Sequence, residues 1–183
     1  MISYAVYGLQ IASELPLPEL LDHILETHHV FLKEELPRLT ALSAKVGRRH
    51  GPNHSQLVEL DTVVQALAAE LLMHLRKEEE VLFPWIRRLC TESSANEQAG
   101  GCGGTVAAPI AVMEEEHEGA GAALLKIREL AGDFQIPEEA CNSWRALYAG
   151  LEALEADTHR HIHKENCAVH PRALALADSP PNS

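Results

Sequence analysis

The chain has 183 residues, a formal net charge of −12 at pH 7, and 46% hydrophobic residues. This length and composition suit one globular domain, and the acidic balance argues against nucleic acid or an anionic membrane as the main partner. No apolar run reaches the roughly 18 residues of a membrane span, and the N-terminus lacks the pattern of a signal peptide, so we expect a cytoplasmic protein.

The first predicted helix follows residues 1–15, which show no regular pattern and are expected to form an N-terminal arm. We expect the helix to begin near Pro16 and to run to about Val46, with a bend or local interruption at Pro37. Its apolar stripe recurs at helical spacing and includes a histidine: Leu21, Leu25, His29, Leu32, Leu36 and Leu39.

The second predicted helix runs from about Ser55 to Leu89, and a glycine-rich loop is expected to follow over residues 91–108. Its apolar stripe alternates steps of three and four residues, which is the spacing of a bundle seam. The stripe contains a histidine and a glutamate: Leu57, Leu60, Val64, Leu67, Leu71, His74, Glu78, Val81 and Trp85.

Two further helices are predicted, from Pro109 to about Gly132 and from Pro137 onward. Residues 178–183 are expected to form a disordered tail. The third stripe is Ile110, Met113, His117, Gly121, Leu124 and Ile127. The fourth is Trp144, Leu147, Leu151, Leu154, Thr158, His161 and Glu165. Residues 16–177 are therefore predicted to fold as an all-α, up-down-up-down four-helix bundle.

An internal repeat divides this bundle into two similar hairpins. His74, Lys77, Glu78 and Pro84 recur as His161, Lys164, Glu165 and Pro171, at the same offsets of 0, +3, +4 and +10. His29 precedes His74 by 45 residues, and His117 precedes His161 by 44. Because residues i and i+4 share a helix face, each copy points an imidazole and a carboxylate in one direction.

Rise per residue predicts that one histidine from each helix reaches the same layer of the bundle. At about 1.5 Å per residue, His29 and His74 lie at similar depths from the turn that joins their helices. His50 and His54 lie in or beside that turn, roughly 25 Å away, and are expected to be surface or turn residues. His28 could replace His29 if the first helix is rotated. Three further histidines lie off the seams and are expected to be solvated or to contact ligand residues: His23, His163 and His170.

Six seam residues are therefore predicted metal ligands: His29, His74, Glu78, His117, His161 and Glu165. A lone core histidine is more often a hydrogen-bonded core residue, but buried carboxylates need a partner, and no Lys or Arg lies on the opposing seams. Six donors are too many for one tetrahedral zinc. Two carboxylates able to bridge suit two octahedral ions; iron is the first choice and manganese the alternative.

Carboxylates beside the ligands are candidates for orienting them. Glu70 and Asp157 precede the two repeat histidines by four residues, and Glu116 precedes His117. Each could hydrogen-bond a ligand imidazole, as residues around metal ligands do, or be an ordinary solvated helix carboxylate. Glu79 and Glu80 are expected to be surface charges.

These motifs resemble the hemerythrin-like (HHE cation-binding) family, and within it the iron–sulfur cluster repair di-iron proteins. The matching text is His74-x-x-Lys77-Glu78-Glu79-x-Val81-Leu82-Phe83-Pro84, Met113-x-x-Glu116-His117, Pro137-x-x-Ala140-Cys141-x-x-Trp144 and His161-Ile162-x-x-Glu165-Asn166. The resemblance implies the same six ligands and two bridging glutamates. It also implies repair of clusters damaged by nitric oxide or peroxide, through iron donation or through binding or reduction of nitric oxide.

Three features depart from that family pattern. The repair proteins carry an N-terminal Cys-Cys domain for which residues 1–15 give no room, there is a glycine-rich insert around Cys102, and the second motif ends in His170-Pro171 where the family has Phe-Pro. Oxygen-carrying hemerythrins have another histidine where Gly121 stands. We therefore expect an open site that favours chemistry or iron transfer over reversible dioxygen storage.

Other functions remain open at this point. The first alternative is a hemerythrin-like module that binds or senses oxygen, nitric oxide or iron. A ferritin-like oxidase is disfavoured because its Glu-x-x-His motif is replaced by His-x-x-x-Glu, and a metal-free structural bundle leaves the buried carboxylates unexplained. Expected partners are nitric oxide, dioxygen or water at the metal pair, and iron–sulfur proteins.

Overall fold

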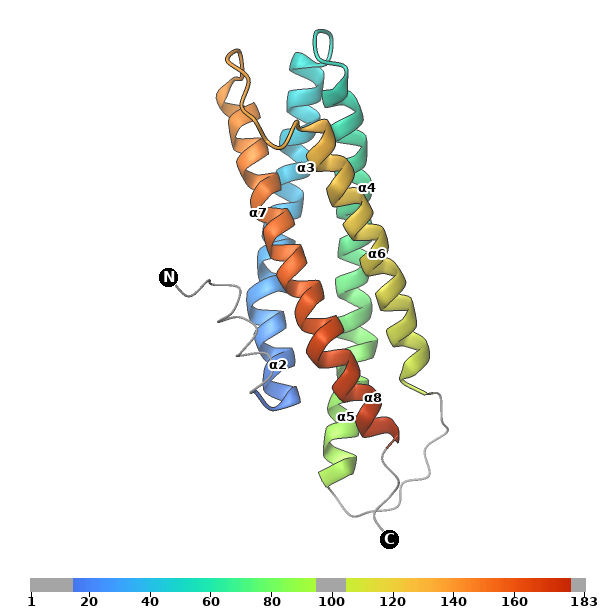
Figure 1. Cartoon of the computed structure of the whole chain (residues 1–183). Helices are drawn as coiled ribbons and strands as arrows, with labels where there is room; N and C mark the ends of the chain where they lie inside the picture. Colours follow the sequence, from blue (N-terminus) through green and yellow to red (C-terminus); the bar gives the residue numbers. More distant parts are fainter. Residues whose placement is uncertain (1–14, 95–104, 179–183) are drawn as a thin grey trace.

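Four helical rods make up the computed structural model, which describes residues 15–94 and 105–178 (Figure 1). Three of them contain a π-helical segment, labelled η. The first rod is α2 (Leu17–Ile24), η1 (Leu25–His29) and α3 (Val30–His50); the second is α4 (Gln56–Lys77), η2 (Glu78–Leu82) and α5 (Phe83–Ser94). The third is α6 (Ala107–Leu130), and the fourth is α7 (Asn142–Lys164), η3 (Glu165–Val169) and α8 (His170–Asp178).

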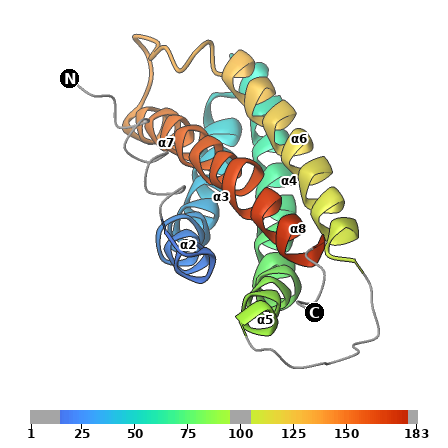
Figure 2. The ribbon, with the colours of Figure 1, turned by 60° about the horizontal axis from the view of Figure 1, so that its bottom comes forward.

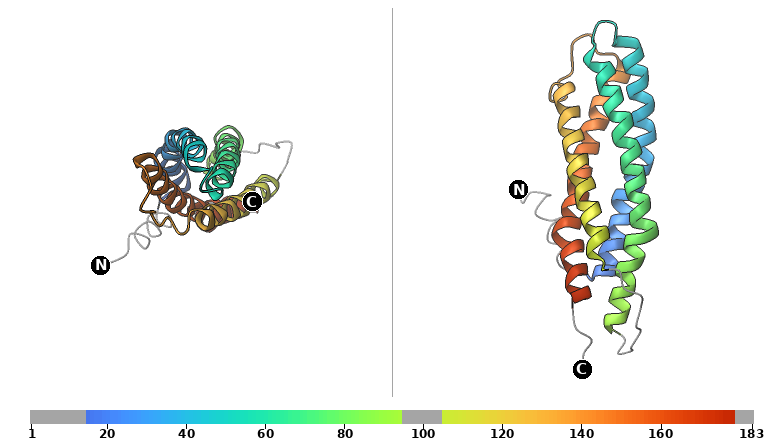
Figure 3. Two further views of the ribbon diagram at one scale, coloured as in Figure 1. Left: turned by 90° about the horizontal axis from the view of Figure 1, so that it is seen from above. Right: turned by 90° about the vertical axis from the view of Figure 1, so that its right-hand side faces the viewer.

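The rods run alternately up and down, which confirms the predicted all-α four-helix bundle. The α3–α4 and α6–α7 connections lie at one end, and α2, α5 and α8 lie at the other (Figures 1 and 3). Helix α3 packs mainly against α4 and α7, and α4 packs against α6, whereas α6 and α7 make fewer contacts with each other. The bundle is therefore least tightly closed between α6 and α7.

The apolar core consists of two clusters, one on each side of the predicted ligand layer. The larger lies toward the two connections and includes Leu36, Leu67 and Leu151. The smaller joins α2, α5, the start of α6 and α8, the group that faces the viewer in Figure 2, and includes Ile24 and Ile86. Polar ligand residues thus occupy a layer between two apolar ones.

The predicted local interruption at Pro37 and the predicted start of the fourth helix are wrong. Pro37 does not interrupt its helix, because it lies on the exposed face of α3, where water can reach the carbonyl that loses its amide partner. The fourth helix begins at Asn142 instead of Pro137, since Ala140 N–H donates to the Pro137 carbonyl in a separate turn. The other helix boundaries differ by a few residues from those predicted.

Some predicted features lie outside the described residues: nearly all of the N-terminal arm 1–15, the central glycines of the loop, and the tail from 179 to 183. Within the described ranges, no helix has an apolar stretch long enough to cross a membrane.

Candidate metal centre

Three of the predicted ligands lie at π-helical turns. His29 is the last residue of η1, while Glu78 and Glu165 are the first residues of η2 and η3. In the last two, the backbone N–H five residues on, from Phe83 and His170, donates to the carbonyl of the glutamate. Such turns change the direction of neighbouring side chains locally and often occur at functional sites.

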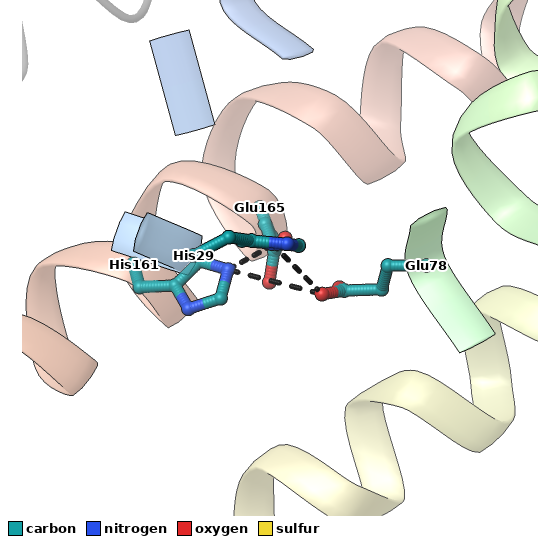
Figure 4. Close-up of side chains that lie close together, drawn as sticks. All are labelled: His29, Glu78, His161 and Glu165. Carbon is teal, nitrogen blue, oxygen red and sulfur yellow. Dashed lines mark hydrogen bonds and ion pairs between the residues drawn. The ribbon is translucent and has the colours of Figure 1, made fainter. Parts of the chain in front are cut away.

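All six predicted ligands are buried and converge in the centre of the bundle. They form two groups, and within each group one donor atom per residue lies within 4.8 Å of all the others. Figure 4 shows the side chains of one group pointing toward one another. The groups are His29, Glu78, His161 and Glu165, and His74, Glu78, His117 and Glu165.

The two glutamates belong to both groups because each carboxylate directs one oxygen toward each group. Two carboxylates arranged in this way can bridge two ions. The four distances are 3.3 Å from Glu78 Oε2 to His29 Nε2, 3.3 Å from Glu78 Oε1 to His74 Nε2, 3.0 Å from Glu165 Oε1 to His161 Nε2, and 3.1 Å from Glu165 Oε2 to His117 Nε2.

Several buried nitrogen and oxygen atoms of these side chains have no hydrogen-bond partner, which indicates that cations belong between them. His29 Nε2, both Glu78 oxygens and Glu165 Oε2 are buried without a hydrogen-bond partner. Each buried polar atom left unpaired costs about 1–3 kcal/mol. The donor set therefore fits metal ions better than it fits a metal-free core.

The spacing of two imidazoles supports the same conclusion. His74 Nε2 and His117 Nε2 lie 3.1 Å apart. Both rings use Nδ1 to donate elsewhere, so in neutral rings two Nε2 lone pairs face each other. Two nitrogens bound at right angles about 2.1 Å from one ion would lie about 3.0 Å apart, which is close to this separation.

Hydrogen bonds at Nδ1 orient three of the four ligand imidazoles. The acceptors are side-chain oxygens, which fix the tautomer with Nε2 available for a metal. The three bonds are His29 to Glu79 at 2.7 Å, His74 to Glu116 at 2.9 Å, and His117 to Asn166 at 2.9 Å. Lys33 holds the Glu79 carboxylate and Lys77 holds that of Glu116.

The two bridging carboxyls have opposite pKa shifts. Burial, together with the charge of Glu165, raises the pKa of Glu78 well above its usual value. Burial would also raise the pKa of Glu165, but His161 and His117 hold that pKa well below its usual value. Glu165 lies closer to its histidines than Glu78 does, so without metal a proton shared by the pair would reside on Glu78 in preference to Glu165.

The three carboxylates that were predicted to orient ligand imidazoles lie in different environments. Glu116 contacts His74, but Asp157 accepts from His28 Nδ1 at 3.0 Å instead of contacting His161, and Glu70 is exposed. The expectation that Glu79 is only a surface charge is wrong, because its carboxylate is half-buried against His29. Asn166 belongs to the motif that resembles the family, but its contact with His117 was not predicted. Both Glu79 and Asn166 directly follow a bridging glutamate, a repeated position that could have identified them.

Two histidines outside the predicted ligand set are buried beside it. His28 is buried with its ring stacked on His161, and Lys164 Nζ lies 2.8 Å from its Nε2 and 2.9 Å from His23 Nε2. His170 is also buried and stacked on His117; neither ring nitrogen has a hydrogen-bond partner, but Nδ1 lies 3.5 Å from Glu114 Oε1.

Four other histidines take no part in the two metal-donor groups. His159 and His163 are exposed. His50 and His54 pack against Trp144 beside the α3–α4 turn, as expected for turn residues.

A cavity of about 360 Å³ reaches this centre between α4, α6 and α7. Three predicted ligands form part of its wall: His74, His117 and His161. Gly121, where we expected the opening, is not among the residues that line the cavity; the small residues of α6 that line it are Gly119 and Ala120. Gly121 is half-buried, and a Cβ atom added there would meet nothing within 4 Å. The centre is therefore accessible to small molecules from this side.

Comparison with known proteins agrees with this geometry. A family model described as the hemerythrin HHE cation binding domain matches residues 20–173. Two relatives named "Iron-sulfur cluster repair protein YtfE", from Yersinia pseudotuberculosis serotype IB (strain PB1/+) and Yersinia pestis (strain Pestoides F), are each 38% identical over 159 residues. The matched region is 87% of this chain and 66% of each relative, so the chain spans just under two thirds of their length.

Proposed function

Because the chain belongs to the hemerythrin HHE cation-binding family, we propose that it is a non-haem di-iron protein that helps to repair iron–sulfur clusters damaged by nitric oxide or oxidants. Repair would proceed by iron donation or by nitric oxide chemistry at the metal pair. The observation that carries this proposal is the sharing of Glu78 and Glu165 between two buried donor groups. A bound metal pair would supply Lewis-acid and redox chemistry, which the protein side chains alone lack.

The donor chemistry supports iron. Each group offers two imidazoles and two carboxylates, which leaves room for further ligands on an octahedral ion. Structural zinc sites are closed and tetrahedral, and they do not need two bridging carboxylates. Manganese has similar preferences and is the alternative metal.

The repair role is supported by the two Yersinia relatives, which are named iron-sulfur cluster repair proteins and are 38% identical to this chain. Those relatives are longer, so their whole activity is a proposal for this chain. We propose nitric oxide, dioxygen or water as ligands in the cavity, and iron–sulfur proteins as the macromolecular partners. We propose a cytoplasmic location, where cysteines such as Cys141 and Cys167 stay reduced.

A second function, sensing of oxygen, nitric oxide or iron, is favoured by the cavity that reaches His74, His117 and His161. A sensor would keep its ions while its ligand binds and leaves. A repair protein that donates iron would lose iron as the damaged target recovers. Measuring the iron content of the chain during the reaction therefore separates the two functions.

The test begins with metal analysis and Mössbauer spectroscopy of anaerobically purified protein. Two iron ions per chain with spectra of a coupled pair are expected, whereas one zinc per chain would overturn the di-iron assignment. An iron–sulfur enzyme inactivated by nitric oxide is then incubated with the iron-loaded chain or with Glu165→Ala as the control. Recovery with the native chain alone supports repair, and equal recovery with both contradicts it.

A further inference from the structure

Two buried polar groups near the metal centre remain unpaired after metal ions are assigned to the six ligands. The described residues have unpaired buried side-chain atoms at His29, Glu78, Trp144, Thr158, Glu165 and His170. Ions would satisfy the donors on His29, Glu78 and Glu165, and Trp144 packs beside the distant α3–α4 turn. Thr158 and His170 remain, and of these Thr158 lines the cavity.

Thr158 is fully buried on α7, one turn before His161 on the same face. A helical threonine commonly donates to a carbonyl in the preceding turn, yet this hydroxyl has no partner. It lines the same cavity as the three imidazoles of His74, His117 and His161. A ligand in the cavity could therefore contact the metal pair and this hydroxyl together.

The internal repeat has an apolar residue at the position equivalent to Thr158. Thr158 precedes His161 by three residues, as Leu71 precedes His74, and both side chains line the cavity. The second copy thus has a hydroxyl where the first has an apolar side chain. Polar side chains of the same cavity include Glu116 and Lys77, which pair with each other, and the exposed Glu70.

We propose that Thr158 is the residue that selects the ligand of this cavity, by hydrogen bonding the outer atom of a small molecule or anion bound at the metal pair. The ligand class is a molecule of two or three heavy atoms whose far end accepts a hydrogen bond. This inference rests on the proposed di-metal site and adds the polar group that favours such ligands over apolar ones of equal size.

Azide is the probe, titrated into the iron-loaded full chain and followed by absorption spectroscopy. Thr158→Val removes the hydroxyl at nearly constant shape and should weaken azide binding about fivefold to tenfold, the range for one lost hydrogen bond. Thr158→Ser retains the hydroxyl and should bind within about twofold of the native chain. Thr62→Val is the matched control, because the exposed Thr62 hydroxyl donates to the Val58 carbonyl away from the cavity.

Two further measurements keep the test specific. Thr158→Val should hold two ions, and in the metal-free state it should unfold at the same or higher temperature, since it loses an unpaired buried hydroxyl. Unchanged azide affinity in Thr158→Val, loss of its ions, lower metal-free stability, or no azide binding by a native chain with two ions would each overturn the role of Thr158. A native chain without two ions would instead overturn the proposed function.

Discussion

His29 donates a hydrogen bond from Nδ1 to Glu79 across 2.7 Å, and Glu79 directly follows the bridging residue Glu78. In the proposed di-metal site, Glu78 would therefore supply a bridge, and its neighbour would orient an imidazole of the same donor group. Asn166, next to Glu165, has the same relation to His117. The repeat thus contains part of the surroundings of the centre as well as its ligands.

Removal of either orienting side chain should weaken metal binding without abolishing it. Glu79→Ala and Asn166→Ala are each expected to lower metal affinity about tenfold, because the imidazole loses its fixed direction. Competition with a chelator measures this affinity. Glu80→Ala is the control, since exposed Glu80 pairs only with Arg76 in the described contacts. Equal affinities in Glu79→Ala and Glu80→Ala would contradict the prediction.

Removal of a bridge should have a larger effect than removal of an orienting side chain. Glu165→Ala is expected to lose the metal pair and, with each ion, about 3 kcal/mol of the unfolding free energy that an ion at a hundredfold excess over its Kd provides. Elemental analysis and urea unfolding measure the two effects. His50→Ala, beside the distant α3–α4 turn, should keep both ions. Unchanged metal content in Glu165→Ala would disprove bridging by this residue.

The metal-free protein should lose stability as the pH rises above about 4.5, through the raised pKa of Glu78. In this window the folded chain holds a proton that the unfolded chain has released, so the free energy of unfolding falls with increasing pH. The lowered pKa of Glu165 adds a contribution that is complete above 4.5 and constant there.

Glu78→Gln removes this titration. Urea unfolding of both metal-free proteins from about pH 5 to about pH 9 should show a smaller loss of stability in the variant. Parallel pH profiles would show that Glu78 does not hold the proton. The same variant should bind fewer ions at every pH, because an amide is a poor bridge.

His170 should reduce the stability of the metal-free chain. Its imidazole is buried without a hydrogen bond at either nitrogen, and its nearest charged group is the exposed Glu114, 3.5 Å from Nδ1. The equivalent residue of the first copy, Phe83, packs on His29 with no polar requirement. His170→Phe should raise the free energy of unfolding by about 1 kcal/mol or more. The reciprocal variant, Phe83→His, should lower it. Destabilisation by His170→Phe would indicate that the imidazole has a buried water or ligand as its partner.

The bundle and the convergence of its ligands follow from periodicity, because stripes at steps of three and four specify helices and the repeat aligns two of them. His74, Glu78, His161 and Glu165 could be identified in this way. The π turns could not, since a bond from residue i+5 to residue i leaves no regular sequence pattern. The start of the fourth helix was misplaced because Pro137 suits a turn as well as a helix N-terminus.

The contacts of side chains around the predicted ligands are harder to predict, because they depend on how each helix is rotated about its axis relative to its neighbours. Asp157 has the same spacing to His161 as Glu70 has to His74, yet Asp157 contacts His28 and Glu70 lies exposed. Spacing along one helix gives the face of a residue, but the partner comes from a neighbouring helix.

The division of the apolar core by the ligand layer determines how cooperatively the bundle unfolds. The smaller cluster, around Ile24 and Ile86, meets the larger one across a polar layer in which several buried atoms have no hydrogen-bond partner when ions are absent. Metal-free protein should therefore open first at α2, α5 and α8, and amide hydrogen exchange should be faster there than in α3 and α4. Binding of the two metal ions should make both ends of the bundle unfold as one unit. The metal supply would then control how far proteases reach the end formed by α2, α5 and α8.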